Sequence, residues 1–271
     1  MLYFFILVCL QIILESFPVS SSGHMVFLEH VINYISCGNI YITGNKVLSH
    51  FLHGPTVVVL AIFFFDKWFF LIKNFKRCWV YVLKIIGLVC IADMVTFFLY
   101  LIFNCSRFAH SLQCFPVGIG FVVSLLFLLT LKYCRREKVA FLTWKKALFI
   151  GFFQGIALLP GVSRFGLTFV AGCWVGLSAR RSFEFSFAIQ WPLIFAGFLS
   201  SVLKIYLCKC NALPVNIFNF YTLLIILLSS IVAFFGLKVA QFMALTNKLW
   251  YFAVFLSFSF ILWIIFVYII L

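Results

Sequence analysis

The chain consists of long apolar stretches separated by short polar gaps. Within the stretches, hydrophobic residues do not alternate with polar ones as they do along the strands of a membrane β-barrel. A helix needs about 20 consecutive apolar residues to cross the hydrocarbon core of a bilayer. Six stretches approach this length and predict transmembrane helices: residues 47–65, 79–103, 116–132, 182–204, 218–238 and 249–271.

Two further apolar regions, residues 1–36 and 147–178, are interrupted near their middle by Pro, Gly and Ser. Non-helical backbone at membrane depth is tolerated only where it is buried in protein or lines a cavity. We therefore predict that each region forms a re-entrant helical hairpin, which enters and leaves the membrane on the same side.

The order of these segments repeats along the chain. Residues 1–132 and 147–271 each hold one interrupted region followed by three predicted spans. An odd number of spans inverts the second copy, and such inverted repeats bring their broken segments together near the membrane midplane. The pattern predicts an all-α polytopic membrane protein, with six transmembrane helices and two re-entrant hairpins in inverted-repeat halves of a single membrane domain, residues 1–271.

Composition agrees with a membrane protein, since 66% of residues are hydrophobic and 10% are charged. The net charge of +14 could suggest a nucleic-acid partner, but the positions of the basic residues argue against one. Fourteen of the 20 lysines and arginines fall in four gaps, at 66–78, 132–146, 178–182 and 238–248. Basic loops stay in the cytoplasm, so both termini are expected to face outward.

The second interrupted region carries a candidate anion site. Pro160 and Gly161 are expected to end one helix, and the next is expected to restart after Gly166. The free N–H groups at the start of a helix favour anions, and the Arg164 guanidinium is suited to phosphate. Arginine at membrane depth is costly and usually functional. The alternative is that Arg164 pairs with a buried acid only to hold the hairpins together.

The first interrupted region offers complementary chemistry. Gln11 and Glu15 are four residues apart and share one helix face. Carboxylate, hydroxyl and imidazole groups are the parts of an activated nucleophile or a general acid–base pair, although a serine-rich turn is also a common helix cap. The break is predicted to consist of Ser20, Ser21, Ser22 and Gly23, and to end at His24.

Together these motifs resemble the undecaprenyl-diphosphatase, or bacitracin-resistance, family. The first family motif, [E/Q]-x-x-x-E, is matched at residues 11–15, and it continues into the P-V-S-S-S-G-H sequence of residues 18–24. The second signature, P-G-x-S-R-S-x-x-T, is matched at residues 160–168 except that Phe165 replaces its second serine. The segments EFSF, from Glu184, and HGPTVVVLA, from His53, also resemble the family.

The resemblance implies a membrane phosphatase that hydrolyses undecaprenyl diphosphate to undecaprenyl phosphate and recycles the lipid carrier of cell-wall synthesis. It implies a multi-pass protein of the bacterial plasma membrane whose site opens to the periplasmic side. It also implies a divalent cation, Mg²⁺ or Ca²⁺, with Glu15 as ligand. The implied catalytic residues are Glu15, Ser21, His24 and Arg164, and the implied phosphate-binding residues are Gln11, Ser22, Gly23, Ser163, Gly166 and Thr168.

Two questions stay open at the level of sequence. Ser21 attacks the distal phosphorus in one mechanism, with His24 or Glu15 accepting its proton, whereas in the other a water attacks and Ser21 only binds phosphate. A lipid-phosphate transporter, or flippase, that uses the same anion site is the rival function, because inverted repeats also build transporters. The roles of Asp93 and Glu184 and the existence of a homodimer are likewise undetermined.

Overall fold

The computed structural model describes residues 2–35, 46–104, 116–134, 140–208 and 219–270, and all regular elements in these ranges are helices. Four of them are long and apolar enough to cross a membrane. They are α6 (Phe75–Asn104), α11 (Ala179–Cys208), α12 (Phe220–Leu245), and α13 (Phe252–Ile270) with the preceding 3₁₀ turn η2 (Leu249–Tyr251). The predicted class, an all-α polytopic membrane protein, is confirmed.

The other two predicted spans are less regular. Residues 47–65 form α3 (Lys46–Phe51) and α4 (His53–Phe63), and the chain then bends by 61° into α5 (Phe65–Lys73). Residues 116–132 form α8 (Val117–Thr130) and the 3₁₀ turn η1 (Leu131–Tyr133), which together are a shorter apolar helix. The count of six spans therefore stays a prediction.

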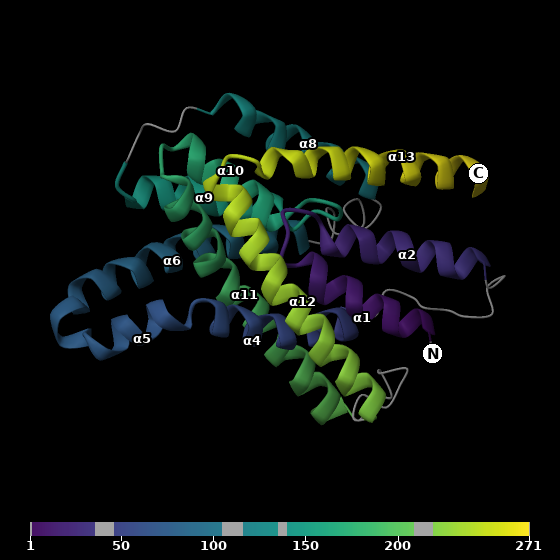
Figure 1. The fold of residues 1–271 in the computed structure, drawn as a ribbon, viewed down its shortest axis with the longest axis horizontal. Helices are drawn as coiled ribbons and strands as arrows, with labels where there is room; N and C mark the ends of the chain where they lie inside the picture. Colours follow the sequence, from purple (N-terminus) through teal and green to yellow (C-terminus); the bar gives the residue numbers. More distant parts are fainter. Residues whose placement is uncertain (1, 36–45, 105–115, 135–139, 209–218, 271) are drawn as a thin grey trace.

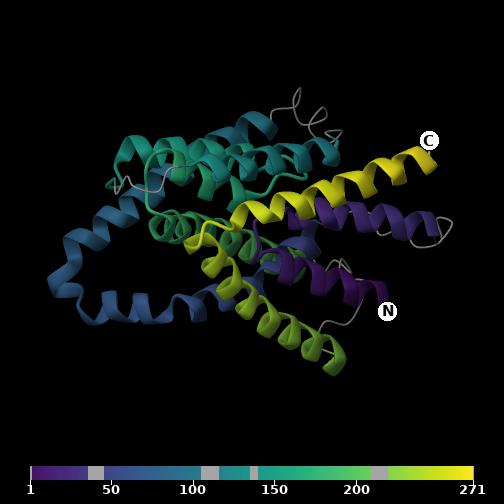
Figure 2. The same ribbon diagram turned by 45° about the horizontal axis from the view of Figure 1, so that its top comes forward.

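The predicted loop at 66–78 is wrong, because α5 and the start of α6 occupy it. Its charged residues Asp66, Lys67 and Lys73 had marked it as a polar gap. In the structure they belong to an amphipathic helix that also carries several aromatic side chains. In Figures 1 and 2, α5 and α6 meet at the end of the molecule opposite the two termini.

Both interrupted regions fold as a helix, a break and a second helix. The first hairpin is α1 (Leu2–Leu14) and α2 (Ser21–Ile35), whose outer ends lie on the side of the termini (Figures 1 and 2). The second is α9 (Trp144–Ile156) and α10 (Arg164–Trp174). The N–H of Ala140 donates to the carbonyl of Gly176 over 3.0 Å, so the chain enters and leaves this hairpin at one place.

The predicted restart points of the two inner helices are each about three residues too late. α2 begins at Ser21, and α10 begins at Arg164 and not after Gly166. The reason is capping, because Ser20 Oγ accepts the N–H of Gly23 over 3.0 Å and Ser163 Oγ accepts the N–H of Gly166 over 3.1 Å. Ser20 thus corresponds to Ser163, and Ser21 and Arg164 are both the first residue of their helix.

The helices pair in a reciprocal way. α9 of the second half packs along α6 of the first, and α1 of the first half packs along α12 of the second. α4 likewise contacts α12, and α11 contacts α6. An inverted repeat would produce this exchange of partners; the division into residues 1–132 and 147–271 stays a prediction.

The two breaks meet at glycines. A Cβ atom on Gly23 would lie 2.7 Å from Cα of Gly161, and a Cβ on Gly120 of α8 would meet the backbone of Pro160 and Gly161. Gly161 has a φ of 83°, a left-handed conformation that disfavours any side chain. Only glycine fits there, because a Cβ would also meet the carbonyl of Val117.

We expect Gly161→Ala to destabilise the protein by about 2 kcal/mol or more, from backbone strain and the clash with Val117. Gly87 of α6 is the matched control, because a Cβ there meets nothing within 4 Å. Gly87→Ala should be neutral or stabilising, since alanine is the better helix former. Thermal unfolding of the detergent-solubilised variants measures both, and equal melting temperatures for them would contradict the left-handed conformation of Gly161 and its close contact with α8.

Candidate active site

Glu15 is the buried acid of the first break. It follows the last residue of α1 and is 7% exposed. The hydroxyl of Thr56 donates to Glu15 Oε2 over 2.7 Å, and Nδ1 of His53 lies 2.7 Å from Oε1. A buried carboxylate needs such partners to remain charged, so α4 holds Glu15 ready as an acid–base group or a cation ligand.

His53 and Thr56 were not among the predicted site residues. Both belong to the HGPT sequence that opens α4, and they are three residues apart, which places them on one helix face. The signal was a histidine and a threonine beside Gly-Pro at the start of an apolar run. It indicated a polar helix end but not the acid that this end contacts.

Arg164 is the cation of the second break and the first residue of α10. Its Nε is buried and has no hydrogen-bond partner among the described residues. Glu15 and Asp93 both interact with it electrostatically, but neither is among its described ion pairs. Arg164 therefore has donor capacity left for a ligand, which favours the predicted anion site over the alternative of a purely structural pair.

Asp93, whose role was undetermined, belongs to a polar cluster between α6 and α9. Nε2 of Gln154 donates to Asp93 Oδ1 over 2.8 Å and to Thr96 Oγ1 over 3.1 Å. The Thr96 hydroxyl also contacts the Gly151 carbonyl at 3.2 Å. Asp93 is thus hydrogen-bonded by Gln154 and also interacts electrostatically with Arg164. Gln154 is a third residue that the sequence analysis missed, after His53 and Thr56.

His24 lies in the first turn of α2. Its Nδ1 is 2.6 Å from the carbonyl of Ser20, and its Nε2 is 3.1 Å from Ser259 Oγ on α13. The ring also stacks on Phe255, with 5.5 Å between centroids. Both nitrogens are therefore engaged, and no contact between His24 and the Ser21 hydroxyl is described.

The hydroxyl groups of the predicted site, of which Ser21 was predicted to be catalytic and the others to bind phosphate, divide into two groups. Ser163 is buried, and its Oγ caps α10, while the Thr168 hydroxyl donates to the carbonyls of Arg164 and Phe165. These hydroxyls have lone pairs or a hydrogen left for a ligand but also have structural roles. Ser21 is half-buried and Ser22 is exposed; among the described residues Ser22 contacts only Ser20, at 3.2 Å, and Ser21 Oγ has no partner.

Phe165, the departure from the family signature, packs into the core. It is 2% exposed, and its ring centroid lies 4.6 Å from that of Phe187 and 5.4 Å from that of Phe183. The side chain at this position therefore contributes to the packing of α10 against α11. The partners of Glu184 also lie outside the proposed site, since it pairs with Lys67 and with Arg180.

One buried amide oxygen is suited to be a ligand of the implied cation. Oε1 of Gln11 is buried without a partner, one helical turn before Glu15. Hard divalent cations take carboxylate and amide oxygens as ligands. Gln11 and Glu15 therefore fit a cation that is also held by substrate phosphates. In the described part of the chain, no three His, Cys, Asp or Glu side chains form a protein-only metal site.

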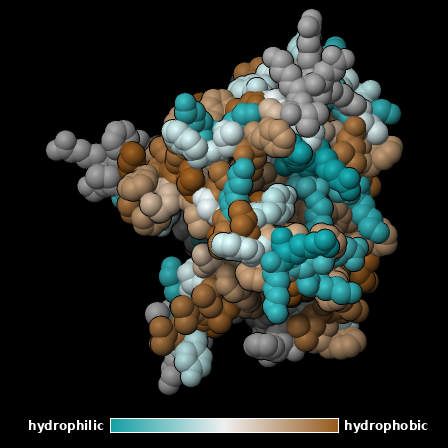
Figure 3. All heavy atoms as spheres, turned by 90° about the vertical axis from the view of Figure 1, so that its left-hand side faces the viewer, coloured by the Kyte–Doolittle hydropathy of each residue, from teal (hydrophilic) through white to brown (hydrophobic). Residues whose placement is uncertain are grey.

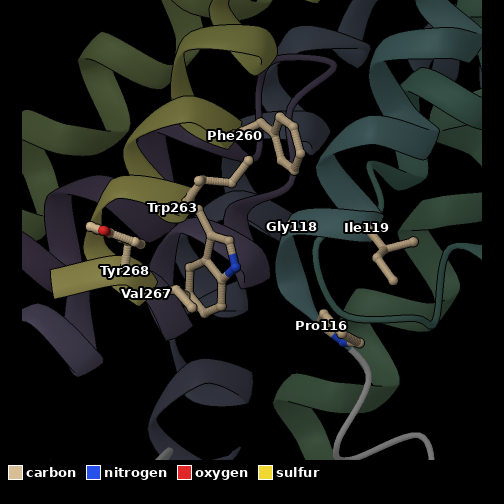
Figure 4. A pocket seen from close by; sticks show the side chains of 8 residues that line it. Pro116, Gly118, Ile119, Phe260, Trp263, Val267 and Tyr268 are labelled. Atoms are coloured by element: carbon tan, nitrogen blue, oxygen red, sulfur yellow. The ribbon is translucent and has the colours of Figure 1, made fainter. Parts of the chain in front are cut away.

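An apolar groove of about 710 Å³ lies between α8 and α13. Figure 4 shows Trp263 of α13 and Pro116 and Ile119 of α8 on its two sides. Trp263 also contacts Phe27 of α2, with centroids 5.7 Å apart. The groove thus begins beside the helix that carries Ser21 and His24. Its lining consists of Pro116, Gly118, Ile119, Phe260, Trp263, Ile264, Val267 and Tyr268.

We expect Thr56→Val to lower the catalytic rate about tenfold or more, because a hydrogen bond to a charged group contributes about 1.5–3 kcal/mol. Valine keeps the size of the side chain but cannot donate to Glu15. Thr56→Ser, which keeps the hydroxyl, is the matched control and should stay near wild type. The phosphate-release rate measures both, and full activity of Thr56→Val would show that this contact does not support catalysis.

The fold and site define a class: an α-helical membrane protein in which two broken hairpins bring an arginine and a buried glutamate together. The family model described as bacitracin resistance protein BacA matches residues 4–262, so the chain belongs to this family.

Among curated relatives, Undecaprenyl-diphosphatase 3 of Bacillus cereus is 28% identical over 211 residues, which are 77% of this chain and 76% of the relative. The Undecaprenyl-diphosphatase of Borrelia hermsii is 26% identical over 264 residues, covering 91% of both chains. That of Aquifex aeolicus is 28% identical over 192 residues, covering 70% of both.

Proposed function

We propose that this protein is a membrane phosphatase that hydrolyses undecaprenyl diphosphate to undecaprenyl phosphate and inorganic phosphate. The observation that carries the proposal is the buried Nε of Arg164, a donor that has no described hydrogen-bond partner at the break of the second hairpin. Family membership and the relatives' name, undecaprenyl-diphosphatase, support it. Nothing in these comparisons supports the transporter alternative.

In the proposed mechanism, Ser21 Oγ attacks the distal phosphorus of the diphosphate. The bond from this phosphorus to the bridging oxygen breaks, and undecaprenyl phosphate leaves. Glu15 accepts the proton of Ser21, because both nitrogens of His24 are engaged by Ser20 and Ser259. A water molecule then releases phosphate from Ser21. Direct attack by water is the competing mechanism, in which Ser21 is only a ligand.

Charge in the transition state is stabilised from both hairpins. Arg164 donates to the oxygens of the transferring phosphoryl group, as arginines do in other phosphoryl-transfer sites. Ser163 and Thr168 flank it on α10, and Gln11, Ser22, Gly23 and Gly166 complete the proposed phosphate contacts. The free N–H groups at the starts of α2 and α10 add two partial positive charges.

We further propose that a divalent cation, Mg²⁺ or Ca²⁺, takes part. Gln11 and Glu15 would hold it, as the unpartnered amide oxygen of Gln11 suggests. When bound, the cation supplies positive charge that neutralises the diphosphate. The isoprenoid tail is proposed to lie in the apolar groove between α8 and α13.

The proposed location is the bacterial plasma membrane, with the site open to the periplasm. The basic gaps support it, because the α5–α6 junction, the start of α9 and the turn between α10 and α11, which carry three of them, lie on the side of the molecule opposite the termini (Figure 1). Several of the basic residues, namely Arg107, Arg135, Arg136, Lys138 and Lys209, lie outside the described residues.

We expect a cysteine introduced at Asn104, at the end of α6, to react with a membrane-impermeant thiol reagent in intact spheroplasts. A cysteine at Lys145, at the start of α9, should react only after lysis. Both belong in a background whose ten native cysteines are replaced. Both side chains are exposed, so access is decided by the side of the membrane. The opposite labelling pattern would reverse the orientation.

Phosphate release from a polyprenyl diphosphate by the purified protein, with and without added Mg²⁺ or Ca²⁺, tests the function itself. We expect cation-dependent release of one phosphate per lipid and accumulation of polyprenyl monophosphate. A protein that binds this lipid but releases no phosphate, and instead moves lipid phosphate between the leaflets of a proteoliposome, would overturn the proposal in favour of a transporter.

A further inference from the structure

A second cavity, of about 750 Å³, lies at the end of the molecule where α5 meets α6. This size is typical of sites that bind small ligands, which have about 300–1,000 Å³. None of the proposed catalytic or phosphate-binding residues lines it. Its walls come from α4, α5, α6, α11 and the segments on either side of the second hairpin.

The inner part of this cavity is apolar. Leu60, Leu88 and Phe187 line it and are each less than 9% exposed. Two tryptophans, Trp68 and Trp191, also line it, and their rings meet edge to face at 5.5 Å. Tryptophan is typical of the boundary between the hydrocarbon and headgroup regions of a bilayer. An occupant must therefore be able to place an apolar chain inside the protein.

In the polar part of the lining, basic side chains outnumber acidic ones. Lys67, Lys84 and Arg181 are basic, whereas Asp66 and Glu184 are acidic. Glu184 is already neutralised, because it pairs both with Lys67 and with Arg180 outside the lining. Asp66 is exposed in the first turn of α5, where an acid offsets the helix dipole.

Lys84 and Arg181 are then left without an acid among the ion pairs that the structure describes. Arg181 is held in place, since its Nη1 donates to the Ala140 carbonyl over 3.3 Å and its guanidinium lies 5.6 Å from the ring centroid of Phe141. Lys84 lies within an apolar stretch of α6. A lysine inside a membrane span is expensive unless it finds an anion or reaches the headgroups.

We propose that this cavity binds an anionic phospholipid of the leaflet that surrounds the α5–α6 end. Its phosphate lies between Lys84 and Arg181, and one acyl chain enters the apolar part beside Leu60 and Leu88. Basic pockets between transmembrane helices bind lipid headgroups in this way. Figure 3 shows hydrophilic side chains gathered beside apolar ones on this end of the molecule.

Native mass spectrometry of protein released from nanodiscs tests the site. The nanodiscs contain equal amounts of phosphatidylglycerol and phosphatidylcholine, which differ in net headgroup charge. We expect the wild type to retain phosphatidylglycerol, and the double variant Lys84→Gln/Arg181→Gln to bind it about tenfold or more weakly, since each basic residue near the surface contributes to the attraction. Ala188→Phe, which fills the apolar part, should also lower retention without any change in charge.

The matched control is Lys145→Gln/Lys248→Gln, which removes the same charge from two exposed residues outside the cavity; it should retain the lipid as the wild type does. Equal retention by the two double variants, or no preference of the wild type for the anionic lipid, would overturn the proposal.

Displacement of the lipid by equimolar polyprenyl monophosphate would overturn the phospholipid assignment and identify a second site for the product. Phosphatase activity is not the readout, so the result is independent of the proposed function.

Discussion

Arg164→Ala should reduce phosphate release by on the order of a thousandfold or more, because an arginine that stabilises the transferring phosphoryl group contributes about 10³–10⁵ to the rate in comparable sites. The structure gives the reason in two observations. Arg164 begins α10, where free N–H groups already favour an anion. Its Nε is buried and has no described partner, so the donor is free to bind the substrate.

Arg164→Lys tests whether the positive charge of Arg164 is sufficient for activity or whether the shape of its guanidinium group is also needed. Lysine keeps the positive charge near Glu15 and Asp93 but cannot donate two parallel hydrogen bonds to one phosphate. We expect it to recover only part of the activity lost in Arg164→Ala. It also controls for misfolding, because removing the cation altogether takes away a charge that interacts with Glu15 and Asp93 and could unfold the protein.

Arg180→Ala is the matched control for Arg164. Arg180 is an exposed arginine that pairs with Glu184 one turn along α11, and exposed pairs contribute about 0–1 kcal/mol. Its loss should leave the rate within about twofold of wild type by that estimate. Near-wild-type release by Arg164→Ala, in a sample that elutes as a single folded species, would reduce Arg164 to a structural residue.

The hairpins could be predicted from sequence because their cause is local. Proline, glycine and serine interrupt an apolar run, and an interruption at membrane depth must be buried in protein. The exact start of each helix could not be predicted in the same way. Ser20, Ser21 and Ser22 are all plausible caps, and the choice of Ser20 depends on how closely Gly23 approaches Gly161.

The contacts of the site could not be predicted, because they join distant parts of the chain. Glu15 meets Thr56 across 41 residues, and Gln154 meets Asp93 across 61. These pairs arise only when α4 packs beside the first break and α9 packs along α6. Sequence patterns identify an acid within a predicted span, such as Asp93, but not the side chain that hydrogen-bonds to it.

The group that accepts the proton of Ser21 could not be predicted from the sequence either. The sequence left both His24 and Glu15 open as the group that accepts this proton. In the structure, the two nitrogens of His24 contact Ser259 on α13 and the carbonyl of Ser20. Glu15, held by His53 and Thr56, is the better candidate for the base. The identity of the nucleophile therefore depends on a direct test of Ser21.

Ser21→Ala should lower phosphate release by on the order of a thousandfold or more while polyprenyl diphosphate still binds, as expected when a covalent step is removed. Ser21 is suited to this role because it begins α2 and its hydroxyl has no described partner. Ser22→Ala is the comparison. If Ser22 only binds phosphate, this substitution should lower the rate of phosphate release about tenfold, the usual contribution of one hydrogen bond to a charged group.

A trapped intermediate gives the second readout for Ser21. Acid quenching of wild-type protein during turnover should yield a peptide phosphorylated at Ser21, and the Ser21→Ala sample should yield none. If Ser21→Ala instead releases phosphate within about tenfold of wild type, the loss has the size expected for a ligand. Ser21 then binds phosphate, water is the nucleophile, and Glu15 is its base. Absence of a phosphoserine together with a thousandfold loss would assign Ser21 to positioning of the attacking water.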